Sequence, residues 1–164
     1  MRTRKETQSV YILKRSLDFW FPGGEWIKIP DVGMGNNKTV KRQYDAMYYY
    51  KNCRAVFEVK RFVNNDNFYF ESVKQHQIDG LIEAWKNGSN AYIVINYYNK
   101  EDRYDRFYFI EIDDFIHWKE CHKTPSLMLL DLENDFHVCF RLDAKTNRDL
   151  KCKILNLDKT YIVG

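Results

Sequence analysis

Paired cysteines and long apolar segments are both missing from this chain of 164 residues. Its four cysteines, Cys53, Cys121, Cys139 and Cys152, include no Cys-x-x-Cys pair. No N-terminal apolar segment has the length of a signal peptide or a membrane span. We therefore expect a cytoplasmic protein with reduced, free thiols and no association with a membrane.

Zinc modules of the common kinds are missing as well. The pairs Cys121-His122 and His137-x-Cys139 offer suitable ligand types, but their spacings match no common module, and side chains adjacent in sequence rarely point the same way. We therefore expect no zinc site. The chain also contains no internal repeats and no low-complexity tracts.

A strong charge of one sign is absent, since the net charge of +3 indicates a polyanionic partner only weakly. The hydrophobic content of 45% and the length suit one compact domain. The basic residues nevertheless form three groups: Arg2, Arg4 and Lys5; Lys38, Lys41 and Arg42; and Lys51, Arg54, Lys60 and Arg61. Each alone fits a solvated loop charge, whereas their grouping favours contacts with phosphates.

Residues 45–60 carry the clearest sign of chemistry, because two β-forming runs are joined there at Lys51-Asn52. Successive side chains of a strand point to opposite faces, so Glu58 and Lys60 share a face and Val59 points away. If the runs pair antiparallel, Asp45 lies across from Glu58. The pattern therefore predicts two acids and one lysine at a single point.

Two carboxylates beside a lysine suit metal-assisted hydrolysis of a phosphodiester, because carboxylate oxygens hold hard cations such as Mg²⁺. The alternative is an ordinary ion pair between Glu58 and Lys60 on a solvated strand. The run Ala55-Val56-Phe57 is apolar on both faces, as in a buried central strand, and Asp45 precedes it at hairpin distance. Charges that enter a buried strand favour the first interpretation.

The pattern along the chain predicts an α/β arrangement. We expect helices over 5–19, 71–86 and 113–120, and a flexible loop over 31–41. We expect strands over 26–29, 45–50, 53–60, 91–98, 107–112, 136–142 and 151–157. The strands over 91–98 and 107–112 are expected to form a hairpin that extends the sheet.

Two polar residues of the second expected helix lie on its apolar side. Gln77 falls four residues from both Val73 and Leu81, and Lys74 projects on the same side. They either complete a metal and phosphate site, or they are a core glutamine bonded to the backbone and a snorkelling lysine. The helical pattern alone favours the second interpretation.

In order and spacing, residues 40–118 resemble the PD-(D/E)xK nuclease superfamily. The resemblance rests on Asp45, on Glu58-Val59-Lys60, on a helix with His76-Gln77, and on the strand Tyr92-Ile-Val-Ile-Asn. The helix with Gln77 makes the chain most similar to the RecU-like and the phage or archaeal-type Holliday junction resolvases. Tyr44 stands where a proline often precedes the aspartate.

The resemblance implies a restriction-endonuclease-like core, with a central mixed β-sheet flanked by helices. Residues 1–164 would form a single nuclease domain, with its core over about 5–118 and a C-terminal extension over about 119–164. Junction cleavage needs two symmetric cuts, so the resemblance also implies a homodimer.

The resemblance also assigns roles to residues. Asp45 and Glu58 would bind Mg²⁺ or Mn²⁺ with the Val59 carbonyl, Lys60 would act on the attacking water, and Gln77 would support the site. Glu6 would add a carboxylate from the first helix. The residues expected to contact DNA are Arg2, Arg4, Lys5, Lys38, Lys41, Arg42, Arg61 and Lys74.

The expected function is a metal-dependent, structure-selective DNA endonuclease of recombination and repair that makes paired nicks in a four-way junction. The protein would act in the cytoplasm of a bacterium, or in the cytoplasm of the host cell if a phage encodes it. No helix-turn-helix or zinc finger is present in the sequence, so junction shape and phosphates would guide binding. The alternatives are a restriction- or repair-type nuclease on the same core, and a catalytically inactive nucleic-acid-binding protein on that fold.

Overall fold

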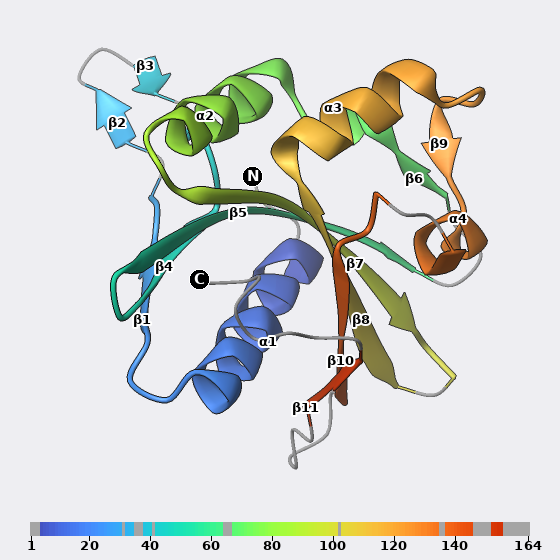
Figure 1. Ribbon diagram of the computed structural model, residues 1–164, viewed down its shortest axis with the longest axis horizontal. Helices are drawn as coiled ribbons and strands as arrows, with labels where there is room; N and C mark the ends of the chain where they lie inside the picture. The colour runs from blue at the N-terminus through green and yellow to red at the C-terminus, as the bar shows by residue number, and fades with distance from the viewer. Residues whose placement is uncertain are drawn as a thin grey trace.

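A seven-stranded sheet forms the centre of the computed structural model, which describes residues 4–30, 32–34, 38–40, 42–63, 67–101, 103–134, 137–145 and 152–155 (Figure 1). In spatial order its strands are β1 (Glu25–Lys28), β4 (Ala46–Tyr50), β5 (Cys53–Val63), β7 (Asn90–Asn99), β8 (Tyr104–Glu111), β10 (Phe140–Lys145) and β11 (Cys152–Leu155).

The sheet is mixed, because β5 and β7 run parallel while all its other neighbouring strands pair antiparallel. Parallel neighbours need a crossover, which α2 (Gln75–Lys86) provides between β5 and β7. In Figure 1, α1 (Arg4–Trp20) covers one face of the sheet, and α2 and α3 (Ile112–Cys121) cover the other. The predicted central mixed sheet with flanking helices is confirmed.

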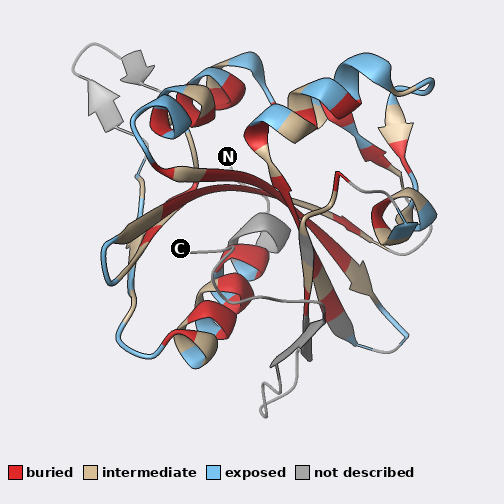
Figure 2. Cartoon of the chain, in the orientation of Figure 1, coloured by how far each residue is buried: buried red, intermediate tan, exposed pale blue. Residues whose placement is uncertain are grey.

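Two apolar layers hold the helices on the sheet, and buried residues line both faces (Figure 2). The layer under α1 contains Leu13, Leu17, Phe57, Tyr92 and Phe109. The layer under α2 and α3 contains Val56, Leu81, Ile93, Ile110 and Trp118. Because side chains of β5 alternate, Phe57 packs toward α1 and Val56 toward α2. This alternation puts Glu58 on the α2 face.

The predicted hairpin of residues 45–60 is confirmed. It turns at Lys51-Asn52, where Lys51 adopts a φ of 54°, and its register pairs Ala46 with Phe57 and Tyr50 with Cys53. The hairpin between β7 and β8 is also confirmed. One step beyond the last pair of the first hairpin, Asp45 lies opposite Glu58.

Several predicted boundaries were wrong. The segment expected as a loop over 31–41 contains the short antiparallel pair β2 (Val32–Met34) and β3 (Lys38–Val40). The helix expected from Glu71 begins at Gln75, after the 3₁₀ turn η1 (Phe70–Ser72). The strand expected over 136–142 occupies 140–145, and the strand expected over 151–157 agrees with β11 over the described residues 152–155. A strand of three residues is too short to show an alternation of apolar and polar side chains, and the glycines and asparagines around β2 and β3 indicate a loop instead.

Three short elements were not predicted. The strands β6 (Phe68–Tyr69) and β9 (Ser126–Leu127) pair with each other, and α4 (Leu129–Asn134) follows. Each is stabilised by contacts distant in sequence. For example, the Phe70 N–H after β6 donates to the Pro125 carbonyl before β9 at 3.2 Å.

The cysteines, the histidines and the helix lengths bear on the expectations about zinc, free thiols and membranes. Among the described residues, the one group of at least three clustered acidic, histidine or cysteine ligands is Glu111, Asp113 and Asp114, so the cysteine and histidine pairs considered for zinc form no such group. Cys53, Cys121 and Cys139 are free thiols. None of the described helices is both long and apolar enough for a membrane span.

Candidate active site

Asp45 and Glu58 bring two carboxylates into the buried region between the sheet and α2. Their exposed fractions are 0% and 1%. The Asp45 N–H donates to the Phe57 carbonyl at 2.8 Å, which continues the β4–β5 ladder by one bond and fixes Asp45 beside Glu58. Acids are almost never this buried without partners, so each needs compensating groups.

Both oxygens of Asp45 receive such groups. The Val59 N–H donates to Oδ2 at 2.9 Å, and Arg42 Nη2 lies 3.2 Å from Oδ1. The Arg42 side chain is itself only 12% exposed. The sequence predicted Arg42 as a DNA contact and gave no sign of this pairing, although the two residues lie only three positions apart.

Glu58 is held through one oxygen only. Lys60 Nζ lies 2.9 Å from Oε1, and Gln77 Nε2 donates to the same Oε1 at 2.6 Å. The second oxygen, Oε2, is buried and has no hydrogen-bond partner among the described residues. A buried carboxylate oxygen left in this way is unfavourable unless something else satisfies it.

Gln77 reaches Glu58 because its amide is locked by the start of α2. The Lys74 N–H donates to Gln77 Oε1 at 2.9 Å, and this bond leaves Nε2 directed at the carboxylate. The carbonyl thus satisfies a backbone donor at the helix start, which is otherwise unpaired. The sequence offered two interpretations of Gln77, a residue of the metal site or a core glutamine bonded to the backbone. The structure shows both contacts, because Gln77 accepts from the Lys74 N–H and donates to Glu58.

The segment that carries Arg42 and Asp45 packs closely on α2. A Cβ atom at Gly80 of α2 would lie 2.3 Å from Gln43 Cβ, which is closer than side-chain carbons approach. Glycine at position 80 therefore lets residues 42–45 lie directly against the helix. The close approach brings the segment that carries Asp45 next to the helix that carries Gln77.

Burial, and after it the negative charge of Asp45, raise the pKa of Glu58 from 4.5 to about 7. Lys60 and Arg42 oppose this shift by favouring the ionised carboxylate.

The residues present fit a hard divalent cation. Such a cation binds carboxylate and carbonyl oxygens, and the site offers two buried carboxylates, one of them with an unsatisfied oxygen. Val59 was predicted to contribute its carbonyl, and the structure shows its N–H in contact with Asp45.

The other predicted residues lie in different places. Lys74 is exposed at the start of α2, with Nζ 3.1 Å from the Glu71 carbonyl. Arg61 points to the opposite face of the sheet, where its side chain is 5% exposed and Nη1 lies 3.4 Å from Asp105. The structure therefore does not bring Arg61 to the carboxylate pair, and its burial contradicts the predicted exposure to DNA.

The remaining predicted residues cannot be placed by side chain. Glu6 lies in α1, on the sheet face opposite Glu58, and its side chain is not described. The side chains of Arg4, Lys5 and Lys38 are not described either. Arg2 and Lys41 lie outside the described residues.

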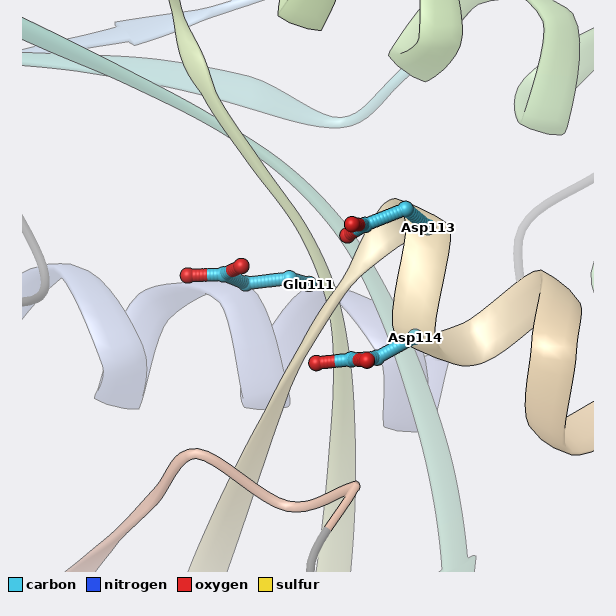
Figure 3. Close-up of side chains that lie close together, drawn as sticks. All are labelled: Glu111, Asp113 and Asp114. Atoms are coloured by element: carbon cyan, nitrogen blue, oxygen red, sulfur yellow. The ribbon is translucent and has the colours of Figure 1, made fainter.

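A second acidic group, which the sequence analysis did not identify, lies where β8 meets α3. One carboxylate oxygen from each of Glu111, Asp113 and Asp114 lies within 4.8 Å of the others, and Figure 3 shows the three side chains pointing to the same side. Partial burial raises the pKa of Glu111, and the two aspartates raise it further. Acids in the first turn of a helix interact favourably with its dipole, which accounts for their presence there.

Comparisons with known proteins place the chain in a family. Residues 37–149, more than half of the chain, match the family model described as Recombination protein U. Among solved structures, that of Archaeoglobus fulgidus Hjc, a Holliday junction resolvase from an archaeal hyperthermophile, matches with a TM-score of 0.42 and 15% identity, over 64% of this chain and 78% of that chain. A comparison with curated proteins gives no match.

The matched region contains both carboxylates, Lys60 and Gln77, and the order of elements expected of a resolvase. The family suggested by residues 40–118 is therefore confirmed. Enzymes of this family cut DNA junctions and depend on divalent metal ions. The chain belongs to the Recombination protein U family of Holliday junction resolvases, which are endonucleases.

Proposed function

We propose that Asp45 and Glu58 bind the divalent ion of a structure-selective endonuclease that makes paired nicks in a four-way DNA junction. The observation that supports this assignment is the unsatisfied, buried Oε2 of Glu58, in a carboxylate that stands beside Asp45. Mg²⁺ is the proposed ion and Mn²⁺ a substitute, since both accept oxygen ligands. The Val59 carbonyl is proposed as a further ligand.

In this proposal the chain's own residues orient the reactants. Lys60 keeps Glu58 ionised through Oε1 and presents its ammonium group to the attacking water, while Gln77 holds the same oxygen from the other element. A bound divalent ion supplies Lewis acidity toward both the phosphate and the water. A bond forms from the water oxygen to phosphorus and one bridging P–O bond breaks. One water proton goes to the leaving oxygen and the other to solvent.

The family supports a proposal for the substrate and for the assembly. A four-way junction has two equivalent strands to cut, so we propose a homodimer in which each subunit supplies one site. The exposed Lys74 is proposed to contact backbone phosphates, and the same role is proposed for Lys38 and Lys41, which precede β4 in the sequence. We also propose that the whole chain forms one nuclease domain and that the protein acts in the cytoplasm.

The proposal is tested by cleavage of a labelled synthetic four-way junction with Mg²⁺, Mn²⁺ or chelator. Linear duplex and flap substrates are run alongside. We expect symmetric paired nicks that are lost in chelator and in Asp45→Asn, while Asp45→Asn still binds the junction. The matched control is Asp18→Asn, since Asp18 pairs with Lys14 on the exposed surface of α1 and such a pair contributes little.

The two alternatives correspond to different results. Preferred cleavage of linear duplex or flap would identify a restriction- or repair-type enzyme on the same core. Absence of cleavage by the wild type, with junction binding retained and no Mn²⁺ bound in calorimetry, would identify an inactive DNA-binding protein. Cleavage at the wild-type rate by Asp45→Asn would remove the assigned site.

A further inference from the structure

Arg42 holds one of the two oxygens that Asp45 can offer to a metal ion. Its Nη2 lies 3.2 Å from Oδ1, while the Val59 N–H donates to Oδ2 at 2.9 Å. Asp45 is fully buried, and the Arg42 side chain is largely buried with it. The guanidinium therefore lies inside the site described above and not on the surrounding surface.

The two acids differ in how they can accept a metal ion. Lys60 and Gln77 both contact Oε1 of Glu58, and Oε2 has no partner among the described residues. A metal ion can therefore bind Oε2 without displacing Lys60 or Gln77. Asp45 has a donor on each oxygen. The Val59 N–H is part of the backbone of β5 and cannot leave. The guanidinium, at the end of a long side chain, is the donor that can move away.

The charges of the site indicate where Arg42 goes. Asp45 and Glu58 balance Arg42 and Lys60, so the four side chains sum to zero. A divalent ion adds two positive charges, and in a buried site these repel a guanidinium that touches the same carboxylate. The charges added by substrate are the negative charge of a phosphodiester and that of a deprotonated water. A phosphate is therefore the new partner for the displaced cation.

We propose that Arg42 is a catalytic residue that exchanges partners: it neutralises Asp45 in the metal-free protein, and in the loaded site it donates to the scissile phosphate. A guanidinium suits this second role, because its fork of N–H groups matches two phosphate oxygens and follows the charge that develops in the transition state. The inference rests on the proposed function of Asp45 and Glu58. It changes the role of Arg42 from general backbone contact to direct participation.

The test measures metal binding and cleavage separately in the full-length protein. Mn²⁺ is titrated into DNA-free wild type, Arg42→Ala and the control Arg15→Ala by calorimetry, since Arg15 is exposed on α1 across the sheet. We expect Arg42→Ala to bind Mn²⁺ several-fold more tightly than the wild type. At saturating Mn²⁺ it should cleave the junction on the order of 100-fold more slowly. Added methylguanidine should restore part of its rate, and Arg15→Ala should match the wild type in both assays.

Two results would overturn the inference. Equal or weaker Mn²⁺ binding by Arg42→Ala would show that Arg42 does not compete with the ion, and an unchanged cleavage rate would show that it does not contact the phosphate. If Arg42→Ala does not fold, Arg42→Gln keeps hydrogen-bond donors without the charge and undergoes the same titration. Failure of the proposed function itself has a different signature, namely a wild type that does not cleave.

Discussion

The two faces of the central sheet carry buried carboxylates with nearly the same surroundings, Glu58 of β5 on one face and Asp105 of β8 on the other. On the α2 face, Glu58 has a lysine and a glutamine amide on one oxygen and none on the other. On the α1 face, Asp105 has Arg61 at 3.4 Å and the Asn96 amide at 3.0 Å, both on Oδ1, and its Oδ2 also lacks a partner among the described residues.

What distinguishes the two carboxylates is a second acid. Burial raises the pKa of both, but only for Glu58 does a neighbouring carboxylate, Asp45, raise it further. Around Asp105 the remaining contacts are neutral or cationic: Ser9 donates to Asn96, and the Arg61 guanidinium lies 4.5 Å from the centre of the Tyr98 ring. We therefore propose a structural role for Asp105 and the metal site at Glu58 and Asp45. A pair of carboxylates attracts a divalent ion.

The largest difference is expected between Glu58→Gln and Asp105→Asn. Glu58→Gln should lower the single-turnover rate of junction cleavage by roughly 1,000-fold or more, about 4 kcal/mol of transition-state stabilisation. Asp105→Asn should leave that rate nearly unchanged and lower the free energy of unfolding by about 3 kcal/mol, because Arg61 stays buried without a charge partner. Urea unfolding and cleavage assays measure both. A comparable loss of cleavage in folded Asp105→Asn would remove the distinction.

The structural role of the ion pair between Arg61 and Asp105 can be examined by replacing both residues with apolar ones. We expect Arg61→Met and Asp105→Leu together to recover much of the stability that either single variant loses, since the combination leaves no buried charge unpaired. A double-mutant cycle from urea unfolding gives the coupling. Additive losses would mean that Arg61 and Asp105 do not act as a pair.

The free energy of unfolding of the metal-free protein should depend on pH through Glu58 and Asp105. The pKa of folded Glu58, about 7, lies above 4.5, so the folded state binds this proton more tightly than the unfolded chain does. Its stabilising contribution is present below about pH 4.5 and is lost as the pH rises through 7. The raised pKa of Asp105 acts in the same direction.

We expect the Glu58 contribution to lower the free energy of unfolding by about 2 kcal/mol between pH 5 and pH 8. Mg²⁺ should restore it at pH 8, and Glu58→Gln should lack it. Urea unfolding of both proteins at the two pH values, with and without Mg²⁺, measures the effect. If Mg²⁺ stabilises Glu58→Gln as much as the wild type, the ion binds elsewhere, for example at the acids of Figure 3.

The smallest expected effects concern the two amides. Gln77→Ala removes a bond to Glu58 and one to the Lys74 N–H, so cleavage should fall about tenfold and stability by about 1 kcal/mol. Asn96→Ala should cost about 2 kcal/mol of stability with little change in cleavage, since Asn96 contacts Ser9, Asp105 and the Arg106 carbonyl. A stronger loss of cleavage in Asn96→Ala than in Gln77→Ala would contradict the comparison.

Local rules were sufficient to predict the centre of the site. The two-residue period of strands placed Glu58 with Lys60, and the short turn at Lys51-Asn52 placed Asp45 opposite them, as the register shows. The long apolar periods likewise predicted α1 and the β7–β8 hairpin, whereas the central mixed sheet was expected from the family resemblance. The short pairs β2–β3 and β6–β9 were not predicted, because elements of two or three residues carry too little pattern.

The sequence by itself therefore determined which acids and which lysine share one face of one strand, because that relation depends only on backbone geometry over a few residues. The tertiary structure alone decided which helix covers that face, that Gln77 reaches Glu58, that Arg42 turns inward to Asp45, and that Arg61 is buried with Asp105. These contacts join long, flexible side chains whose directions depend on packing between distant elements, and no local spacing encodes that packing.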